Sequence, residues 1–243
     1  MSSYKNHAIF GILLALPLIP DPLYLFFALL GASIPDLDHE NNTNKVLDMF
    51  MVGVVLSVLL FFFNGFHLGG LLLVLVALIF YVSKHRSFTH TLVGILMLSS
   101  IFTLMIMGFI PTVTYFGVFM GLSLPSNMVL FIALAIVGYF VVSRKILLMY
   151  LLVLGLYLII FPKNYLMLNW TFVGVMFMTG ALSHLILDLW TPQGLKLFLP
   201  VSEKTYHKKI ALLLLSLWIV CCIYLVLVNG SLFSNLIHIF TYT

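Results

Sequence analysis

Long apolar runs separated by short polar segments form most of this chain of 243 residues. No Asp, Glu, Lys or Arg occurs at positions 49–83, 87–143, 146–162, 164–187 or 210–243. The runs are continuous rather than alternating, which favours helices over the period-two pattern of a membrane β-barrel. Because a helix of about 20 mostly apolar residues crosses a bilayer, the pattern predicts a bundle of membrane-spanning helices.

Turn-forming residues divide the apolar runs into individual helices. Asn64-Gly65 and Gly69-Gly70 interrupt the first run, and Pro162 ends a later one. The segment 111–125, bounded by two prolines, is predicted to be broken or re-entrant, and the tail 231–243 to lie at the membrane interface. We expect full spans at about 46–63, 67–83, 90–110, 126–143, 146–161, 165–190 and 210–229.

The N-terminal segment 7–34 is apolar but contains Pro17, Pro20, Asp21 and Pro22. It predicts two short helices joined by a turn at 20–22. At about 1.5 Å per residue, helices of about 12 residues reach only about 18 Å, so this hairpin is not expected to cross the membrane fully. The predicted fold is therefore all-α, an integral membrane bundle of about seven spans plus a short N-terminal hairpin, in a single domain covering 1–243.

Composition supports the same class of protein. Hydrophobic residues make up 63% of the chain and charged residues 7%, whereas a soluble domain carries about a quarter of its residues as charges. This excludes a soluble enzyme and a disordered protein. The net charge of +4 is small and the chain contains no dense basic run, so we expect no nucleic-acid partner. The adjacent Cys221 and Cys222 lie in an apolar run and are interpreted as packing residues.

The few basic residues fall mostly on one side of the predicted bundle. When the spans are connected in order, only Lys163 lies on the opposite side. The positive-inside rule then places the larger set at the cytoplasmic face of a multi-pass protein of the inner (plasma) membrane. That set is Lys5, Lys45, Lys84, Arg86, Arg144, Lys145, Lys196, Lys204, Lys208 and Lys209.

Polar clusters occur on the same predicted side, and the most informative ends the helix 165–190. His184 and Asp188 are four residues apart, so they share a helix face and can hold one cation or form a structural pair. Another cluster contains Asp36 and Asp38, which by themselves are equally consistent with helix capping. A third cluster, 85–90, has histidines at both ends, which a turn at its second and third residues would bring together.

Together, the clusters indicate a metal centre more strongly than any one of them does. Imidazole and carboxylate groups without thiolates suit zinc, manganese or iron. Seven candidate ligands exceed what one catalytic zinc requires and predict a site of two or three ions, of the kind that cleaves phosphoesters. The alternative is a purely structural polar network. The candidates are His7, Asp36, Asp38, His85, His90, His184 and Asp188.

Four motifs also resemble a known family. They are N-H-A-I-F-G at 6–11, G-A-S-I-P-D-L-D-H at 31–39, H-R-S-F-T-H at 85–90 and S-H-L-I-L-D-L-W-T-P-Q-G at 183–194. In this order the motifs resemble the YdjM-like membrane-bound metal-dependent hydrolases, which are grouped with the zinc-dependent phospholipase C and nuclease superfamily. The resemblance covers about 6–209 and implies an α-helical hydrolase with the seven candidate ligands in or near its metal site.

The combined expectation is a membrane-embedded hydrolase that cleaves a phosphoester of a lipid or other amphiphilic substrate with a metal-activated water at the cytoplasmic interface. We expect zinc as the metal, with manganese as an alternative, and membrane lipids as partners. Asp38 is the candidate bridging group or general base, and Arg86 the candidate phosphate ligand. The competing functions are a divalent-metal transporter, whose site should lie near the bilayer midplane, and a structural protein whose metal only links helices.

Overall fold

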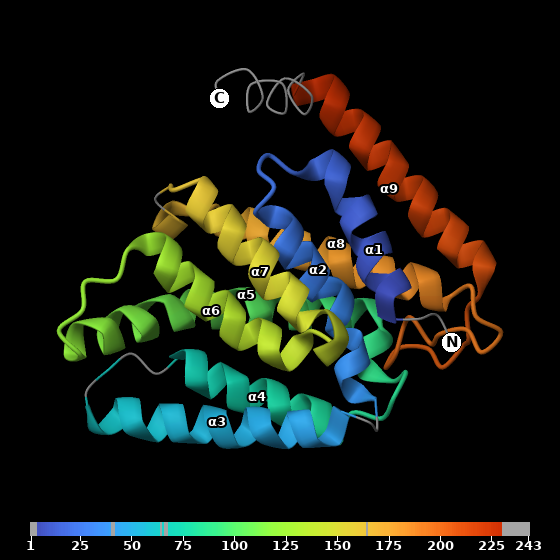
Figure 1. Cartoon of the computed structure of the whole chain (residues 1–243). Helices are drawn as coiled ribbons and strands as arrows, with labels where there is room; N and C mark the ends of the chain where they lie inside the picture. The colour runs from blue at the N-terminus through green and yellow to red at the C-terminus, as the bar shows by residue number, and fades with distance from the viewer. Residues whose placement is uncertain (1–3, 40–41, 64, 66–67, 164, 230–243) are drawn as a thin grey trace.

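The computed structural model describes residues 4–39, 42–63, 65, 68–163 and 165–229 (Figure 1). Within these ranges the regular structure is helical, and the one β-type pairing is an isolated bridge between Leu195 and Tyr206. The predicted all-α class is therefore confirmed. Among the described residues, four helices are long and apolar enough to cross a membrane, at Thr43–Phe62, Leu92–Phe119, Trp170–Asp188 and Lys208–Leu225. Leu68–Val82 and Ser126–Val141 are shorter apolar helices.

The N-terminal segment forms the predicted short hairpin. Helix α1 (Tyr4–Ala15) continues into the short 3₁₀ turn η1 (Leu16–Leu18), and α2 (Tyr24–Ser33) returns to the starting side. The carboxylate of Asp21 accepts a hydrogen bond from the backbone N–H of Leu23, which fixes the turn between them. A second 3₁₀ turn, η2 (Pro35–Asp38), follows α2 directly.

Seven further α-helices of the described residues complete the bundle. The hairpin α3 (Thr43–Phe62) and α4 (Leu68–Val82) leads through the 3₁₀ turn η4 (Phe88–His90) into the long α5 (Leu92–Phe119). Then follow α6 (Ser126–Val141) and α7 (Arg144–Ile160). After η5 (Tyr165–Met167) come α8 (Trp170–Asp188) and α9 (Lys208–Asn229), and α9 lies along the outside of the bundle (Figure 1). The predicted interfacial tail 231–243 lies outside the described residues.

Two predicted boundaries are wrong. Helix α5 continues through Pro111 to Phe119, so the expected break at 111–125 is confined to the connection before α6. Proline is tolerated inside membrane helices, where local adjustment and side-chain hydroxyls compensate for the missing N–H. Here Thr112, next to Pro111, donates its hydroxyl to the Gly108 carbonyl. Helix α8 begins at Trp170 rather than near 165, because the Asn169 side chain caps the N–H of Phe172.

The closest packing in the bundle joins α2 to α8. A Cβ atom on Gly180 would lie 2.0 Å from the carbonyl oxygen of Ala28, and one on Gly31 would lie 2.2 Å from that of Phe177. Small residues therefore let the two backbones touch, as is common between membrane helices. This contact fixes the end of α8 beside the turn that follows α2, where several candidate ligands lie.

Lys163, which the topology placed on the far side, lies beside Asp21 in the turn of the N-terminal hairpin. Lys163 Nζ is 2.8 Å from Asp21 Oδ2, and the hydroxyl of Tyr157 also donates to the Asp21 carboxylate. Burial alone would raise the pKa of Asp21, but these hydrogen bonds outweigh it and hold that pKa below its ordinary value. Figure 1 shows the N-terminus and the α8–α9 connection at the other end of the bundle, consistent with the predicted separation of charges.

Candidate metal centre

The structure brings all seven predicted ligands to one end of the bundle. They come from four segments that are distant in sequence, namely α1, η2, the η4 region and the last two turns of α8. The side chains of His90 and His184 are fully buried, and those of His7 and Asp188 nearly so. Three groups of ligand atoms lie within 4.8 Å of one another: His7, Asp36 and His184; His90, His184 and Asp188; and Asp38, His85 and His90.

The Asp188 carboxylate lies between several of the other candidate site residues. Its Oδ1 lies 3.7 Å from His7 Nε2, and its Oδ2 lies 3.6 Å from both His90 Nε2 and His184 Nε2. The guanidinium of Arg86 also lies 3.7 Å from Oδ1. One carboxylate therefore faces groups from two segments besides its own, α1 and the η4 region.

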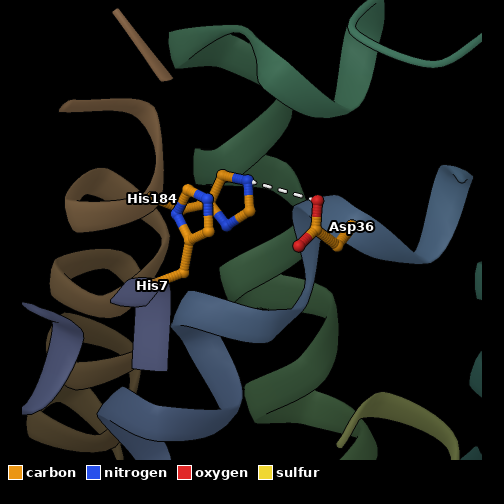
Figure 2. A group of neighbouring side chains, drawn as sticks. All are labelled: His7, Asp36 and His184. Atoms are coloured by element: carbon orange, nitrogen blue, oxygen red, sulfur yellow. Dashed lines mark ion pairs between the residues drawn. The ribbon is translucent and has the colours of Figure 1, made fainter. Parts of the chain in front are cut away.

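Asp36 extends the same centre. Its Oδ1 lies 3.5 Å from His184 Nε2, and the His184 ring stacks on His7 with centroids 3.8 Å apart. Figure 2 shows these three side chains converging from α8, η2 and α1. The backbone carbonyl of Asp36 accepts a hydrogen bond from the Asn42 side chain, which anchors the turn that carries the carboxylate.

Hydrogen bonds fix which imidazole nitrogens are free. His184 Nδ1 lies 2.8 Å from the carbonyl oxygen of Ala32, and because a carbonyl only accepts, this nitrogen carries the proton. In the neutral ring, Nε2 is then left with its lone pair directed at the carboxylates. Nε2 of His90 and His184, and Nδ1 of His7, are buried without a hydrogen-bond partner among the described residues. Unpaired buried polar atoms are costly, which suggests that a ligand normally completes them.

The spacing of these atoms fits shared metal ligation better than direct hydrogen bonding. Ligand atoms about 2.1 Å from a tetrahedral ion lie about 3.4 Å apart. The four separations around Asp188 and Asp36 are between 3.5 and 3.7 Å, beyond the usual hydrogen-bond range of about 2.7–3.2 Å. The residues present therefore fit zinc or a similar divalent ion.

Asp38 makes contacts of a different kind. Its Oδ1 lies 2.7 Å from His85 Nδ1, which is a hydrogen bond, and its Oδ2 accepts the hydroxyl proton of Thr89. Oδ2 also lies 3.3 Å from His90 Nδ1. Burial by itself would raise the pKa of Asp38, but the contacts with His90, His85 and Thr89 outweigh burial and lower it. An ionised Asp38 thus holds two imidazoles by Nδ1 and leaves their Nε2 atoms free, as carboxylates do behind metal-bound histidines.

His90 belongs both to the group around Asp188 and to the group around Asp38. Because Thr89 gives its only hydroxyl proton to Asp38, the Thr89 oxygen, 3.0 Å from His90 Nδ1, acts as an acceptor. The Nδ1 of His90 therefore carries the proton, and its Nε2 faces Asp188. Complete burial lowers the pKa of His90, which favours the neutral imidazole that binds metals.

The predicted turn at Arg86 and Ser87 is present and brings His85 and His90 together. Their ring centroids are 5.4 Å apart. Arg86 adopts φ 60°, a left-handed conformation that is uncommon outside glycine and often found at functional sites. Its NH1 donates to the Gln193 side chain, while its buried Nε has no partner within the described part of the chain.

A cavity of about 550 Å³ lies beside the centre, between η2, the start of α3 and the end of α4. Asp38 and His85 form part of its wall, and His39 and Lys84 lie farther along it. His39, which belongs to the P-D-L-D-H motif, has its ring 5.0 Å from that of His85. The cavity gives the centre a neighbouring space lined by polar groups.

Sequence reasoning missed several supporting groups. Thr89, Gln193 and the carbonyl of Ala32 each hold a candidate site residue in place. Thr89 and Gln193 lie inside the quoted motifs, so their positions were a usable signal. The role of a backbone carbonyl depends on how α2 and α8 pack, which no local pattern reveals.

The chain matches a known protein family over almost its whole length. A sequence model described as YdjM inner membrane protein matches residues 1–241. The chain belongs to the YdjM family. This confirms the family part of the resemblance and a membrane location. No curated protein and no solved structure matches the chain.

Proposed function

We propose that this member of the YdjM family is a metal-dependent hydrolase of phosphoester bonds, related to the zinc-dependent phospholipase C and nuclease superfamily. The observation that carries the proposal is the surrounding of Asp188, where three imidazoles lie at ligand spacing and one guanidinium approaches the same carboxylate. A purely structural network would be expected to close these contacts into hydrogen bonds. Here the facing nitrogens stay too far away, and Nε2 of His90 and of His184 lacks another partner among the described residues.

The proposed metal is zinc, with manganese as the alternative. Asp188 presents Oδ1 to His7 and Oδ2 to His90 and His184, so one carboxylate could serve two ions, which supports a site of more than one ion. His184 would bind one of them through Nε2, because its Nδ1 is bonded to Ala32. When bound, such ions lower the pKa of water and polarise a phosphoryl oxygen. The residues that would hold them are His7, Asp36, His90, His184 and Asp188.

The other polar groups act around that centre. The NH2 group of Arg86 lies 3.7 Å from Asp188, its buried Nε has no partner among the described residues, and its planar fork suits a phosphate oxygen. His85 is held by Asp38 through Nδ1, so its Nε2 is free to accept or deliver a proton. We therefore assign Asp38 to positioning His85 and His90, in place of the ligand and general-base roles that the sequence suggested.

Asp38→Asn is expected to weaken zinc binding about 10–100-fold, the usual effect of losing an orienting group behind a metal ligand. The amide cannot accept from both imidazoles and from Thr89 as the carboxylate does. Competition against a chelator measures the zinc affinity, and thermal unfolding of the metal-free protein provides the control. An unchanged affinity, or a loss that follows unfolding alone, would contradict the positioning role.

We propose about seven spans with the metal centre at the cytoplasmic interface. Support comes from the Asp21–Lys163 pair at the opposite end and from the exposed Trp190, over which Lys208 lies 5.6 Å from the ring centroid. Tryptophan and lysine are typical of membrane interfaces. An interfacial centre suits a lipid or other amphiphilic substrate.

Cysteine labelling tests this orientation. In a variant with Cys221 and Cys222 replaced by alanine, Ser123→Cys marks the α5–α6 connection and Thr205→Cys the α8–α9 connection. A membrane-impermeant maleimide should label Ser123→Cys in intact spheroplasts and Thr205→Cys only after permeabilisation. The reverse pattern would invert the proposed topology.

The decisive test of the function combines metal analysis with turnover. The purified protein should contain zinc and should release phosphate or headgroup from at least one member of a phospholipid and phosphodiester panel. Chelation should stop the release, and added zinc should restore it. Metal flux into liposomes without turnover would favour the transporter. The placement of the centre at helix ends supports the hydrolase over that function.

A further inference from the structure

A second hollow lies on the outside of the bundle, away from the metal centre. It encloses about 680 Å³ between α1, α2 and α7, within the range of about 300–1,000 Å³ typical of ligand sites. Its walls are mainly apolar and include Ile9, Ile12, Leu25, Leu29, Met149 and Val153. None of the candidate metal ligands lines it. The groove is therefore separate from the site described above.

The groove is polar at one end. Lys5 near the start of α1 and Lys145 near the start of α7 both line it, and both side chains are exposed. They lie on the side that carries the metal centre, where His7 follows Lys5 by two residues on α1. Between these cations and the far end, only apolar and aromatic side chains line the groove. A ligand that fits must combine an anionic head with an apolar tail.

One buried tyrosine belongs to the wall of the groove. Tyr150 is only 4% exposed, and its ring also packs against Gly138 of α6. It lies five residues along α7 from Lys145, so the wall is apolar and aromatic about 7.5 Å below the lysine.

The length of the groove matches one acyl chain. Along α7 the lining residues run from Lys145 to Tyr157, a rise of about 18 Å. One leaflet of the hydrocarbon core is about 15 Å thick. Beyond Tyr157 the Asp21–Lys163 pair closes the far end with polar groups.

We propose that this groove binds one acyl chain of an anionic phospholipid, with the phosphate between Lys5 and Lys145. The pairing of charge with an apolar channel of leaflet length favours a lipid over a helix from a second copy. Such a helix would bury both lysines against apolar side chains. The proposal concerns binding alone and stands apart from the hydrolase activity.

Native mass spectrometry of the purified full chain tests the proposal. The protein is mixed with phosphatidylglycerol and phosphatidylcholine that carry identical acyl chains. We expect one phosphatidylglycerol to be retained in preference to phosphatidylcholine. The double variant Lys5→Gln/Lys145→Gln should weaken that retention about tenfold. Lys196→Gln/Lys204→Gln, which removes two exposed lysines from the same side, is the matched control and should leave it unchanged.

A second pair of variants tests the apolar part. Ile12→Trp places a large ring in the groove and should reduce retention of both lipids, whereas Leu13→Trp places the same ring on an exposed neighbouring position and should not. Equal retention of the two lipids, or insensitivity to Lys5→Gln/Lys145→Gln and Ile12→Trp, would overturn the proposal. A dimer that Ile12→Trp dissociates would overturn it in favour of a second copy.

Discussion

Asp188→Asn is expected to lower the affinity of the protein for zinc by at least about 100-fold, more than the change expected for an orienting residue. The substitution keeps the shape of the side chain but removes its charge. That charge faces His7, His90 and His184, besides Arg86, so its loss affects every proposed ligand group at once. Elemental analysis after equilibration in zinc buffers measures the change.

The chain offers a matched control for this experiment. Asp48 lies exposed on α3, outside all three groups of candidate ligands. Asp48→Asn removes the same charge by the same chemical change and should leave the zinc content intact. His184→Ala should behave like Asp188→Asn. Equal zinc affinity in Asp188→Asn and Asp48→Asn would show that the centre is a structural polar network.

Gly180→Ala is expected to lower the stability of the protein strongly. The new Cβ would lie 2.0 Å from the Ala28 carbonyl oxygen and 2.7 Å from the Ala32 nitrogen, and both are backbone atoms that cannot rotate away. Helices α2 and α8 would have to separate. Overpacking of this kind costs about 1–3 kcal/mol and occasionally more, and a backbone obstacle places this case at the upper end. Thermal unfolding in detergent measures the effect.

Gly174→Ala provides the comparison on the same helix. There the nearest atom to an added Cβ is Thr103 Oγ1 at 3.5 Å, an ordinary contact. Alanine also favours the helix by about 1 kcal/mol relative to glycine, so this variant should be as stable as the parent or more stable. If both variants unfold at the same temperature, the α2–α8 contact is looser than described.

Much of the candidate site could be predicted because charge is so rare in this chain. The placement of the basic residues on one side of the membrane was enough to predict one shared end for the main candidate ligands, and the structure brings them together there. These ligands are His7, Asp36, His90, His184 and Asp188. Local patterns could not reveal which of the candidate residues lie at ligand spacing and which hold other candidates in place. Asp36 and Asp38 are two residues apart, yet one faces His184 at ligand spacing and the other hydrogen-bonds His85.

The fold prediction failed where tertiary context overrides a local signal. Pro111 marks a helix end in water, but a membrane helix can continue through a proline, and α5 does so. The left-handed backbone at Arg86 is a similar case, because no residue preference favours arginine there. It follows from the contacts that hold the guanidinium between Gln193 and Asp188.

The unequal lengths of α5 and α7 have a consequence for the surrounding bilayer. With 28 residues α5 is about 42 Å long, whereas the 17 residues of α7 give about 25 Å, against a hydrocarbon core of about 30 Å. A long helix answers such hydrophobic mismatch by tilting, and a short one by thinning the lipid around it. If α7 crosses the bilayer as proposed, lipid headgroups beside it are thus expected to sit deeper than elsewhere around the protein. Such thinning would shorten the path of a lipid phosphate to the proposed metal centre.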